Sequence, residues 1–122
     1  MNTVEVLKAL ADETRLRMLN LLVEAGDLCG CEVEAILSLS QSNASRHLTR
    51  LRQVGLIAGE KRGQWMHFRA TAQALDKEGF VTAALRAARD DLAALEVDRR
   101  RFDDYCKSPY QCTTIKEWTA CS

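Results

Sequence analysis

The strongest constraint on the fold is an amphipathic segment from Ser40 to Val54, followed directly by two short segments, 56–62 and 65–70, on either side of Gly63-Gln64. Ser40 is a typical helix N-cap, and Gly55 suits the left-handed residue just past a helix end. Polar and apolar side chains alternate in the second segment, as they do in a strand. The pattern predicts a helix over 40–54 and a β-hairpin with arms at 56–62 and 65–70.

Apolar residues at spacings of three and four predict further helices before and after this unit. One Pro and six Gly in 122 residues fit a mainly α chain, because both residues disfavour helix interiors. Two helices joined tightly and followed by a basic hairpin make a winged helix-turn-helix with a two-stranded β-hairpin wing. The other expected helices span 4–10, 12–25, 31–37 and 79–105, with a polar connection at 71–78.

The last part of the chain divides into a long helix and a tail. Apolar residues recur along 79–105 in a narrow stripe, which suits either a dimerisation seam or packing on the helix's own domain. We favour a dimerisation helix, so that residues 1–105 form one winged helix-turn-helix DNA-binding and dimerisation domain. Residues 106–122 contain Pro109, three cysteines and little periodicity, and we expect a flexible tail there.

Charge is concentrated in one region although the formal net charge is zero. Residues 40–70 hold six basic residues and one acid, a positive surface of the kind that attracts phosphate. A solvated helix face is the alternative interpretation. The expected contacts with base edges are Gln41, Ser42, Ser45 and Arg46, and those with phosphates are Thr49, Arg50, Lys61, Arg62 and Gln64.

No apolar run approaches the roughly 18 residues that span a bilayer, and no signal peptide is visible. We therefore expect a cytoplasmic protein with no membrane partner. In such a compartment thiols stay reduced, so the five cysteines are expected to serve metal binding or redox chemistry. Cys29 and Cys31 can both face one small soft ion, whereas structural zinc sites typically use Cys-x-x-Cys.

Five stretches of the chain, in order and at matching spacings, resemble the ArsR/SmtB family of metalloregulatory repressors. They are ALADETRLR at 9–17, LCGCE at 28–32, LSQSNASRHL at 39–48, LRQVGLI at 51–57 and GQWMHFR at 63–69. The Cys-x-Cys pair is most similar to that of the arsenic- and antimony-sensing members. The resemblance implies a homodimeric repressor that occupies double-stranded operator DNA and leaves it when As(III) or Sb(III) binds, without an organic cofactor.

The arsenic site of the best-known members has a third cysteine, and Glu34 stands at its position here. Cys29 and Cys31 are therefore the ligands that carry over. Trivalent arsenic commonly takes three thiolates, so two ways of completing the site stay open. One is a tail cysteine, and the other, which we slightly favour, is a two-thiolate site completed by solvent or an added thiol. The tail candidates are Cys106 and Cys112, with Cys121 dispensable.

Other interpretations remain beside this one. The family's second site, for zinc or cobalt, finds no support because 81–105 contains no His, and His47 is expected to be half-buried rather than a ligand. The same fold could sense thiol oxidation, or Cd(II) and Pb(II). We expect no enzyme, because no Cys-x-x-Cys or phosphate-binding loop follows a strand.

Overall fold

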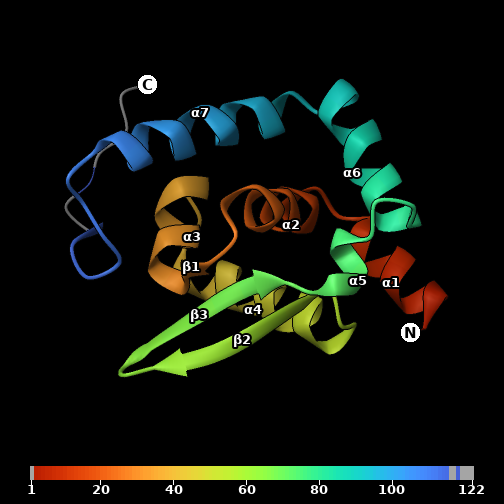
Figure 1. Cartoon of the computed structure of the whole chain (residues 1–122), viewed down its shortest axis with the longest axis horizontal. Helices are drawn as coiled ribbons and strands as arrows, with labels where there is room; N and C mark the ends of the chain where they lie inside the picture. The colour runs from red at the N-terminus through yellow and green to blue at the C-terminus, as the bar shows by residue number, and fades with distance from the viewer. Residues whose placement is uncertain (1, 116–117, 119–122) are drawn as a thin grey trace.

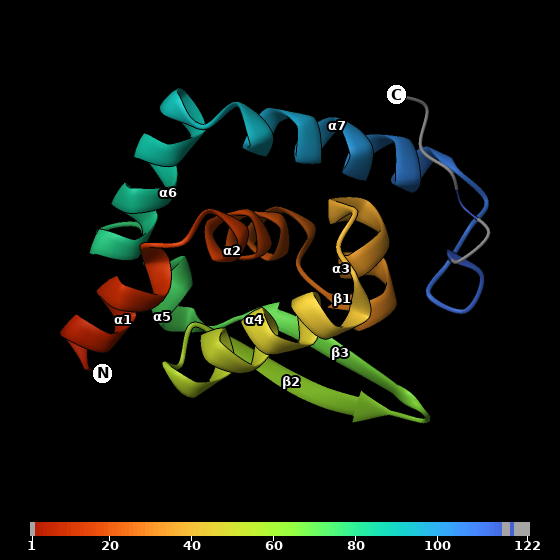
Figure 2. The same cartoon turned by 180° about the vertical axis from the view of Figure 1, so that it is seen from behind.

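The computed structural model describes residues 2–115 and residue 118. Its helices are α1 (Thr3–Leu10), α2 (Glu13–Ala25), α3 (Gly30–Leu37), α4 (Gln41–Gln53), α5 (Ala72–Leu75), α6 (Phe80–Asp91) and α7 (Ala93–Lys107). Its strands are β1 (Leu28–Cys29), β2 (Ile57–Arg62) and β3 (Trp65–Ala70). Figures 1 and 2 show α2 in the middle of the molecule, with α7 on one side and the sheet with α4 on the other. No helix in the described part of the chain is long and apolar enough to cross a membrane.

The expected hairpin forms, and a short strand joins it. β2 pairs antiparallel with β3, and Gly63 makes the turn between them at a φ of 61°, which glycine adopts without strain. β1 pairs with the other edge of β3, where Cys29 lies opposite His67. The sequence analysis did not predict β1, because two residues are too few for a period-two pattern. This strand attaches the first cysteine to the wing.

The N-cap predicted at Ser40 is confirmed, and α2 has an N-cap as well. The Asp12 side chain accepts the Arg15 backbone N–H at 3.0 Å, and the Ser40 hydroxyl accepts that of Asn43 at 3.2 Å. The apolar faces of α2, α3 and α4 then meet the sheet in one core. Burial of each large aliphatic side chain contributes about 1.5–3 kcal/mol. The fully buried members include Met18, Leu19, Leu22, Ile36, Leu37, Leu51 and Leu56.

The expected single helix over 79–105 is wrong, because the structure contains α6 and α7 with Leu92 between them in an extended conformation (φ −112°, ψ 97°). Two adjacent acids, Asp90 and Asp91, close α6, and negative charge at a helix C-terminus opposes the helix dipole. The break redirects α7 across α2 and α3 (Figure 1). Another difference is α5, which lies within the expected polar connection.

The apolar stripe of the expected long helix packs on the chain's own core. Val81 and Leu85 of α6 and Leu95 of α7 are almost fully buried. A buried ion pair anchors α7, where Arg17 of α2 donates to both carboxylate oxygens of Asp98 at 2.9 Å. Asp98 is 3% exposed, and the hydrogen bonds to it raise the pKa of Arg17 further. The chain thus uses this stripe internally and leaves Val97, at 53% exposure, on the outer side of α7.

Candidate nucleic-acid interface and thiol site

The outer face of α4 presents the polar side chains that the sequence analysis assigned to base edges. All four of these residues are exposed: Gln41, Ser42, Ser45 and Arg46. The Arg46 guanidinium donates to the Asn43 side-chain oxygen at 2.7 Å, which holds it along the helix. Among the assigned phosphate ligands, Thr49 is exposed, whereas Arg50 is half-buried and donates to Glu5 of α1 at 2.6 Å.

The opposite face of α4 fixes the helix in the core. Ala44, Leu48 and Leu51 are buried there, as their spacing predicts. His47 is 7% exposed, and its Nδ1 accepts from the Arg15 guanidinium at 3.1 Å. Burial lowers the pKa of His47; the nearby Asp12 opposes this effect, Arg15 reinforces it, and the net shift is downward. This histidine is therefore a neutral packing residue that fastens α4 to α2.

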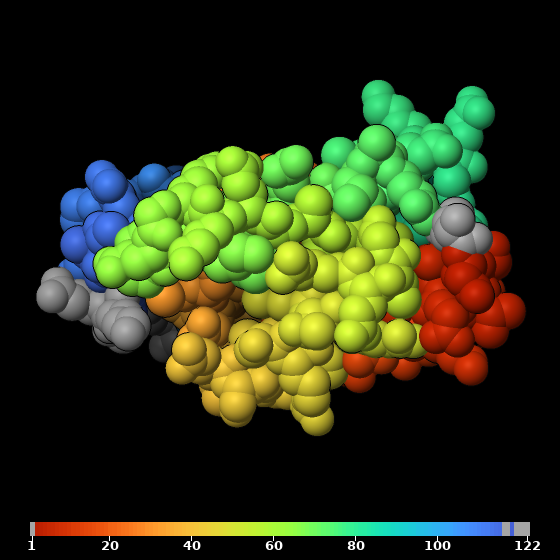
Figure 3. Space-filling model, turned by 90° about the horizontal axis from the view of Figure 1, so that it is seen from below, coloured from red at the N-terminus to blue at the C-terminus, as the bar shows by residue number. Residues whose placement is uncertain are grey.

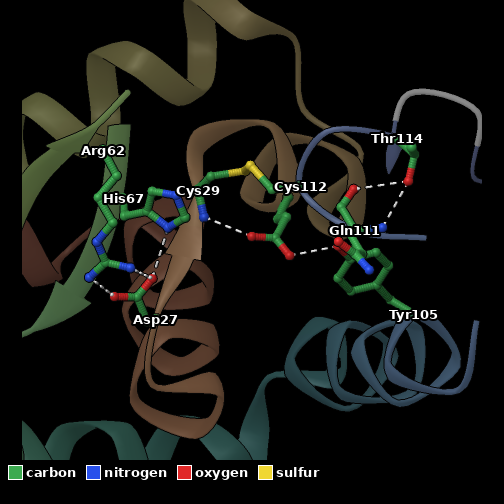
Figure 4. Close-up of a disulfide and its surroundings, with 9 residues drawn as sticks. Asp27, Cys29, Arg62, His67, Tyr105, Gln111, Cys112 and Thr114 are labelled. Atoms are coloured by element: carbon green, nitrogen blue, oxygen red, sulfur yellow. Dashed lines mark hydrogen bonds and ion pairs between the residues drawn. A yellow bond between two sulfur atoms is a disulfide. The ribbon is translucent and has the colours of Figure 1, made fainter. Parts of the chain in front are cut away.

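The wing carries the remaining assigned residues, and one of them is held by an acid. Lys61 and Gln64 are exposed near the hairpin turn. Arg62 donates to Asp27 at 2.8 Å, and the His67 Nδ1 lies 2.9 Å from the same carboxylate (Figure 4). Partial burial raises the pKa of Asp27, but the hydrogen bonds from His67 and Arg62 outweigh this effect and the net shift is downward.

Helix α4 and the wing occupy one face of the molecule. Figure 3 shows α4 beside the hairpin, with α1 at one end. The close approach depends on Gly59 of β2, where an added Cβ would lie 2.9 Å from Met66 Cε and 3.2 Å from the Arg52 guanidinium. The side chain of Arg52 therefore passes directly over this glycine. The geometry places a basic hairpin alongside the polar face of a helix, which suits a groove and its adjoining backbone.

Cys29 begins α3 and is fully buried. It is the N-cap, so Cys31 lies inside the first helical turn. The Cys29 backbone N–H donates to Glu32 Oε1 at 2.8 Å, and the Tyr105 hydroxyl of α7 donates to Glu32 Oε2 at 2.6 Å. Burial, with the Glu32 carboxylate nearby, raises the pKa of Tyr105 well above its usual range. Glu32 thus joins the first cysteine to the last helix.

The structure brings Cys29 together with Cys112 in a disulfide, with their Cα atoms 6.2 Å apart (Figure 4). Within the described residues, one group of potential metal ligands lies within 4.8 Å of one another: Cys29, Glu32 and Cys112. Cys31 is half-buried beside a small pocket of about 180 Å³ that Ile115 also lines. Cys106 is exposed on α7, and Cys121 lies outside the described residues.

The C-terminal end of α3 is also attached to α7. The Arg101 guanidinium donates to the backbone oxygens of Ile36 at 2.5 Å and Ala35 at 2.8 Å. Arg17, which pairs with Asp98, donates to the last carbonyl of α3, that of Leu37, at 2.9 Å. Both ends of α3 are therefore connected to α7, so a displacement at Cys29 is carried by the whole helix.

Comparison with known proteins identifies similar chains. Residues 12–58 match the family model described as bacterial regulatory protein, arsR family. The chain is 47% identical over 64 residues to the arsenic resistance transcriptional regulator ArsR1 of Pseudomonas putida, covering 52% of this chain and 50% of that protein. It is 47% identical over 66 residues to the arsenical resistance operon repressor of Escherichia coli, covering 54% and 56%. The structure of HlyU from Vibrio cholerae matches with a TM-score of 0.61 at 31% identity, covering 75% of this chain and 91% of that one.

The chain spans about half the length of these two curated relatives. The region that matches the family model contains Cys29, Cys31 and α4, whereas Cys112 lies outside it. The structural match confirms the predicted winged helix fold. The names of the two sequence relatives describe a transcriptional regulator and a repressor, in agreement with the expectation that this chain is not an enzyme.

Proposed function

This chain belongs to the ArsR family of bacterial regulatory proteins, and we propose that it is a homodimeric repressor that binds operator DNA and is released by trivalent arsenic or antimony. One observation carries the proposal. A polar, basic DNA-facing surface on α4 and the wing lies next to a buried thiol at the start of α3, the helix that precedes α4. In this proposal the inducer binds one element away from the surface whose position it must change.

In the proposed DNA complex, α4 enters the major groove with its N-terminal half. Arg46 donates to a guanine edge, and Gln41 and Ser45 read neighbouring bases. Lys61 and Gln64 of the wing contact the backbone beside the groove. Arg50 and Arg62 reach phosphates only after exchanging their ion pairs with Glu5 and Asp27 for phosphate oxygens. Their net contribution is therefore smaller than that of Lys61.

Exposed apolar side chains support the homodimer. Val4 is 59% exposed and Leu7 50% exposed, and both lie on α1 one helical turn apart. Val97 on the outer side of α7 is a further large apolar residue that the single chain leaves in solvent. A two-fold dimer would present two copies of α4 to successive major grooves, which lie about 34 Å apart.

The proposed inducer site begins with Cys29 and Cys31. Thiolates select soft ions over abundant hard cations, and As(III) and Sb(III) are soft. Drawing both sulfurs toward one ion shifts the first turn of α3, and α3 passes the shift to α4 through the short connection at 38–40. A coupling of about 1–3 kcal/mol between inducer and operator would be typical of such a change.

The structure also favours a second candidate, a repressor released by oxidation, because Cys29 and Cys112 are bonded. Peroxide would take two electrons and two protons from the two thiols and leave as water. Mass spectrometry on the reduced chain after mild peroxide and after arsenite separates the two functions. A mass gain from arsenic with operator release supports the first, and a loss of two hydrogens with operator release supports the second.

A gel shift tests the proposal as a whole. The probe is the DNA upstream of the protein's own gene, with As(III), Sb(III), Cd(II) and Pb(II) added in turn. We expect a specific complex that As(III) and Sb(III) dissociate. Release by Cd(II) or Pb(II) alone would mean that the protein senses those ions instead. A complex that no ion dissociates would contradict metalloregulation.

A further inference from the structure

The segment after α7 turns back and covers the start of α3. Cys112 lies 83 positions after Cys29 in the sequence, yet the two sulfurs meet. Three residues later, Ile115 is 1% exposed and belongs to the hydrophobic core. It lines the same small pocket as Cys31, together with Glu34, Ala35 and Leu39. One short segment therefore lies against both Cys29, the N-cap of α3, and Cys31 in its first turn.

Contacts other than the disulfide also hold this segment. The Trp118 ring packs edge-on against the Tyr105 ring with centroids 5.4 Å apart, and the Arg101 guanidinium lies over the Trp118 ring. Such aromatic pairs contribute about 0.5–1.5 kcal/mol beyond their buried area. The Gln111 backbone N–H donates to the Thr114 hydroxyl at 2.9 Å, closing a turn around Cys112. The position of Cys112 thus has support that reduction of the disulfide does not remove.

We propose, on the basis of the proposed function, that Cys112 of the same subunit is the tail thiolate of the inducer site and acts together with Cys29. Within the described residues, these are the two cysteines whose sulfurs share a group of potential ligands. Cys106 does not belong to this group and lies exposed on α7. The segment that carries Cys112 closes over bound arsenic.

The chemistry balances without an oxidant. The disulfide is first reduced by two molecules of a small-molecule thiol, which together supply two electrons and two protons and leave joined to each other as a disulfide. Each protein thiol then gives its proton to a hydroxyl of As(OH)₃, so one As–S bond forms, one As–O bond breaks and one water leaves. Cys29, Cys112 and Cys31 in turn make three As–S bonds and release three waters. The arsenic is neither oxidised nor reduced.

Glu32 gives this site a connection to α7. The same carboxylate accepts the Cys29 N–H and the Tyr105 hydroxyl. Tyr105 is also the ring on which Trp118 packs, so the tail, Glu32 and the N-terminus of α3 meet at one point. Arsenic bound between Cys29 and Cys112 therefore pulls on α3 from the side of α7. A site made only by Cys29 and Cys31 would not connect α3 to the tail in this way.

The test titrates reduced full-length chain, bound to labelled operator, with arsenite and follows fluorescence anisotropy. We expect Cys112→Ser to need at least about tenfold more arsenite than the wild type, as loss of a metal-site group commonly costs 10–100-fold in affinity. The matched control Cys106→Ser should respond as the wild type does. Unchanged operator affinity without arsenite shows that each variant is folded, and Cys112→Ala repeats the test without a hydroxyl. Release of Cys112→Ser at the wild-type concentration overturns the proposal.

X-ray absorption on the As(III) complexes decides independently of DNA. Three sulfurs per arsenic in the wild type and two in Cys112→Ser support the proposal, and three in both overturn it. If the wild type never releases operator, the proposed function fails, while the sulfur count still decides whether Cys112 binds arsenic. A mixture of Cys29→Ser and Cys112→Ser chains should remain unresponsive, because a restored response would place Cys112 in the partner's site.

Discussion

The proposed DNA-facing surface and the candidate thiol site are built in opposite ways. All of the recognition face comes from α4 and the adjoining hairpin, within thirty consecutive residues from 41 to 70. The thiol site joins Cys29 and Glu32 to Tyr105 and Cys112, which lie 73 and 83 positions away along the chain. The first surface follows from local periodicity, whereas the second exists only after α7 has packed. In the proposed function, the first is the surface that reads DNA, and the second is the site that controls it. They are called the reading surface and the controlling site.

The largest expected effect concerns the packing of α7, on which the thiol site depends. Asp98→Asn should destabilise the fold by about 3 kcal/mol, because it leaves the partly buried Arg17 without a charged partner. Urea unfolding monitored by circular dichroism measures the change. Asp103→Asn, which removes an exposed ion pair with Arg99, is the matched control and should leave the unfolding midpoint unchanged. Equal midpoints for both variants would show that the buried pair does not anchor α7.

The next effect concerns the reading surface alone. Arg46→Ala should weaken specific operator binding by about 100-fold, since a dimer loses two base contacts that are worth about 1–3 kcal/mol each. Anisotropy with operator and with scrambled DNA measures the specific part. Arg86→Ala on α6, also exposed, is the control. Operator affinity that survives Arg46→Ala would remove α4 from the recognition role.

A smaller effect distinguishes two basic residues of the wing. Lys61→Ala should weaken binding to all sequences and lower the salt slope by about one unit for each copy. Arg62→Ala should act in the same direction but less, because Arg62 already pairs with Asp27 and Glu60. Affinities across a salt series provide both slopes. A larger loss with Arg62→Ala would mean that the ion pairs of the free protein do not compete with phosphate.

The smallest expected effect concerns the ion pair between Asp27, which precedes β1, and Arg62 of the wing. Asp27→Asn should raise affinity for operator by about threefold, because it releases Arg62 from an exposed ion pair. The arsenite concentration needed for release should not change, since Asp27 lies outside the sulfur group. Parallel anisotropy titrations measure both quantities. A shift in the arsenite response would show that the wing and the thiol site are one unit.

The sequence was sufficient for the parts of the fold that depend on neighbours. Ser40, the face formed by Ala44, Leu48 and Leu51, and the turn at Gly63 follow from capping, periodicity and glycine geometry. The break at Leu92 was not predictable from periodicity, because the apolar spacing continues through it. The adjacent acids Asp90 and Asp91 disfavour continuation of α6, and the turn lets Asp98 of α7 pair with Arg17 of α2, a contact that periodicity does not show.

Only part of the candidate thiol site could be predicted from the sequence. Cys29 and Cys31 stand out as a soft pair, and the tail offered Cys106 and Cys112 equally. What separates these two is that α7 continues through Cys106 and leaves it exposed, whereas the chain beyond Pro109 returns to α3. Nothing in the sequence pattern assigns Glu32 to the site. Its two hydrogen bonds appear only when α3 and α7 are side by side.

The central claim is that an ion bound at the start of α3 releases a surface carried by α4. The most direct measurement compares wild type and Cys29→Ser, both reduced and bound to labelled operator, during a titration with arsenite. Both chains should bind operator equally before arsenite is added, because Cys29 is fully buried and its side chain cannot reach DNA. The account predicts that arsenite then releases the wild type while Cys29→Ser stays bound. Release of Cys29→Ser at the wild-type arsenite concentration would contradict it.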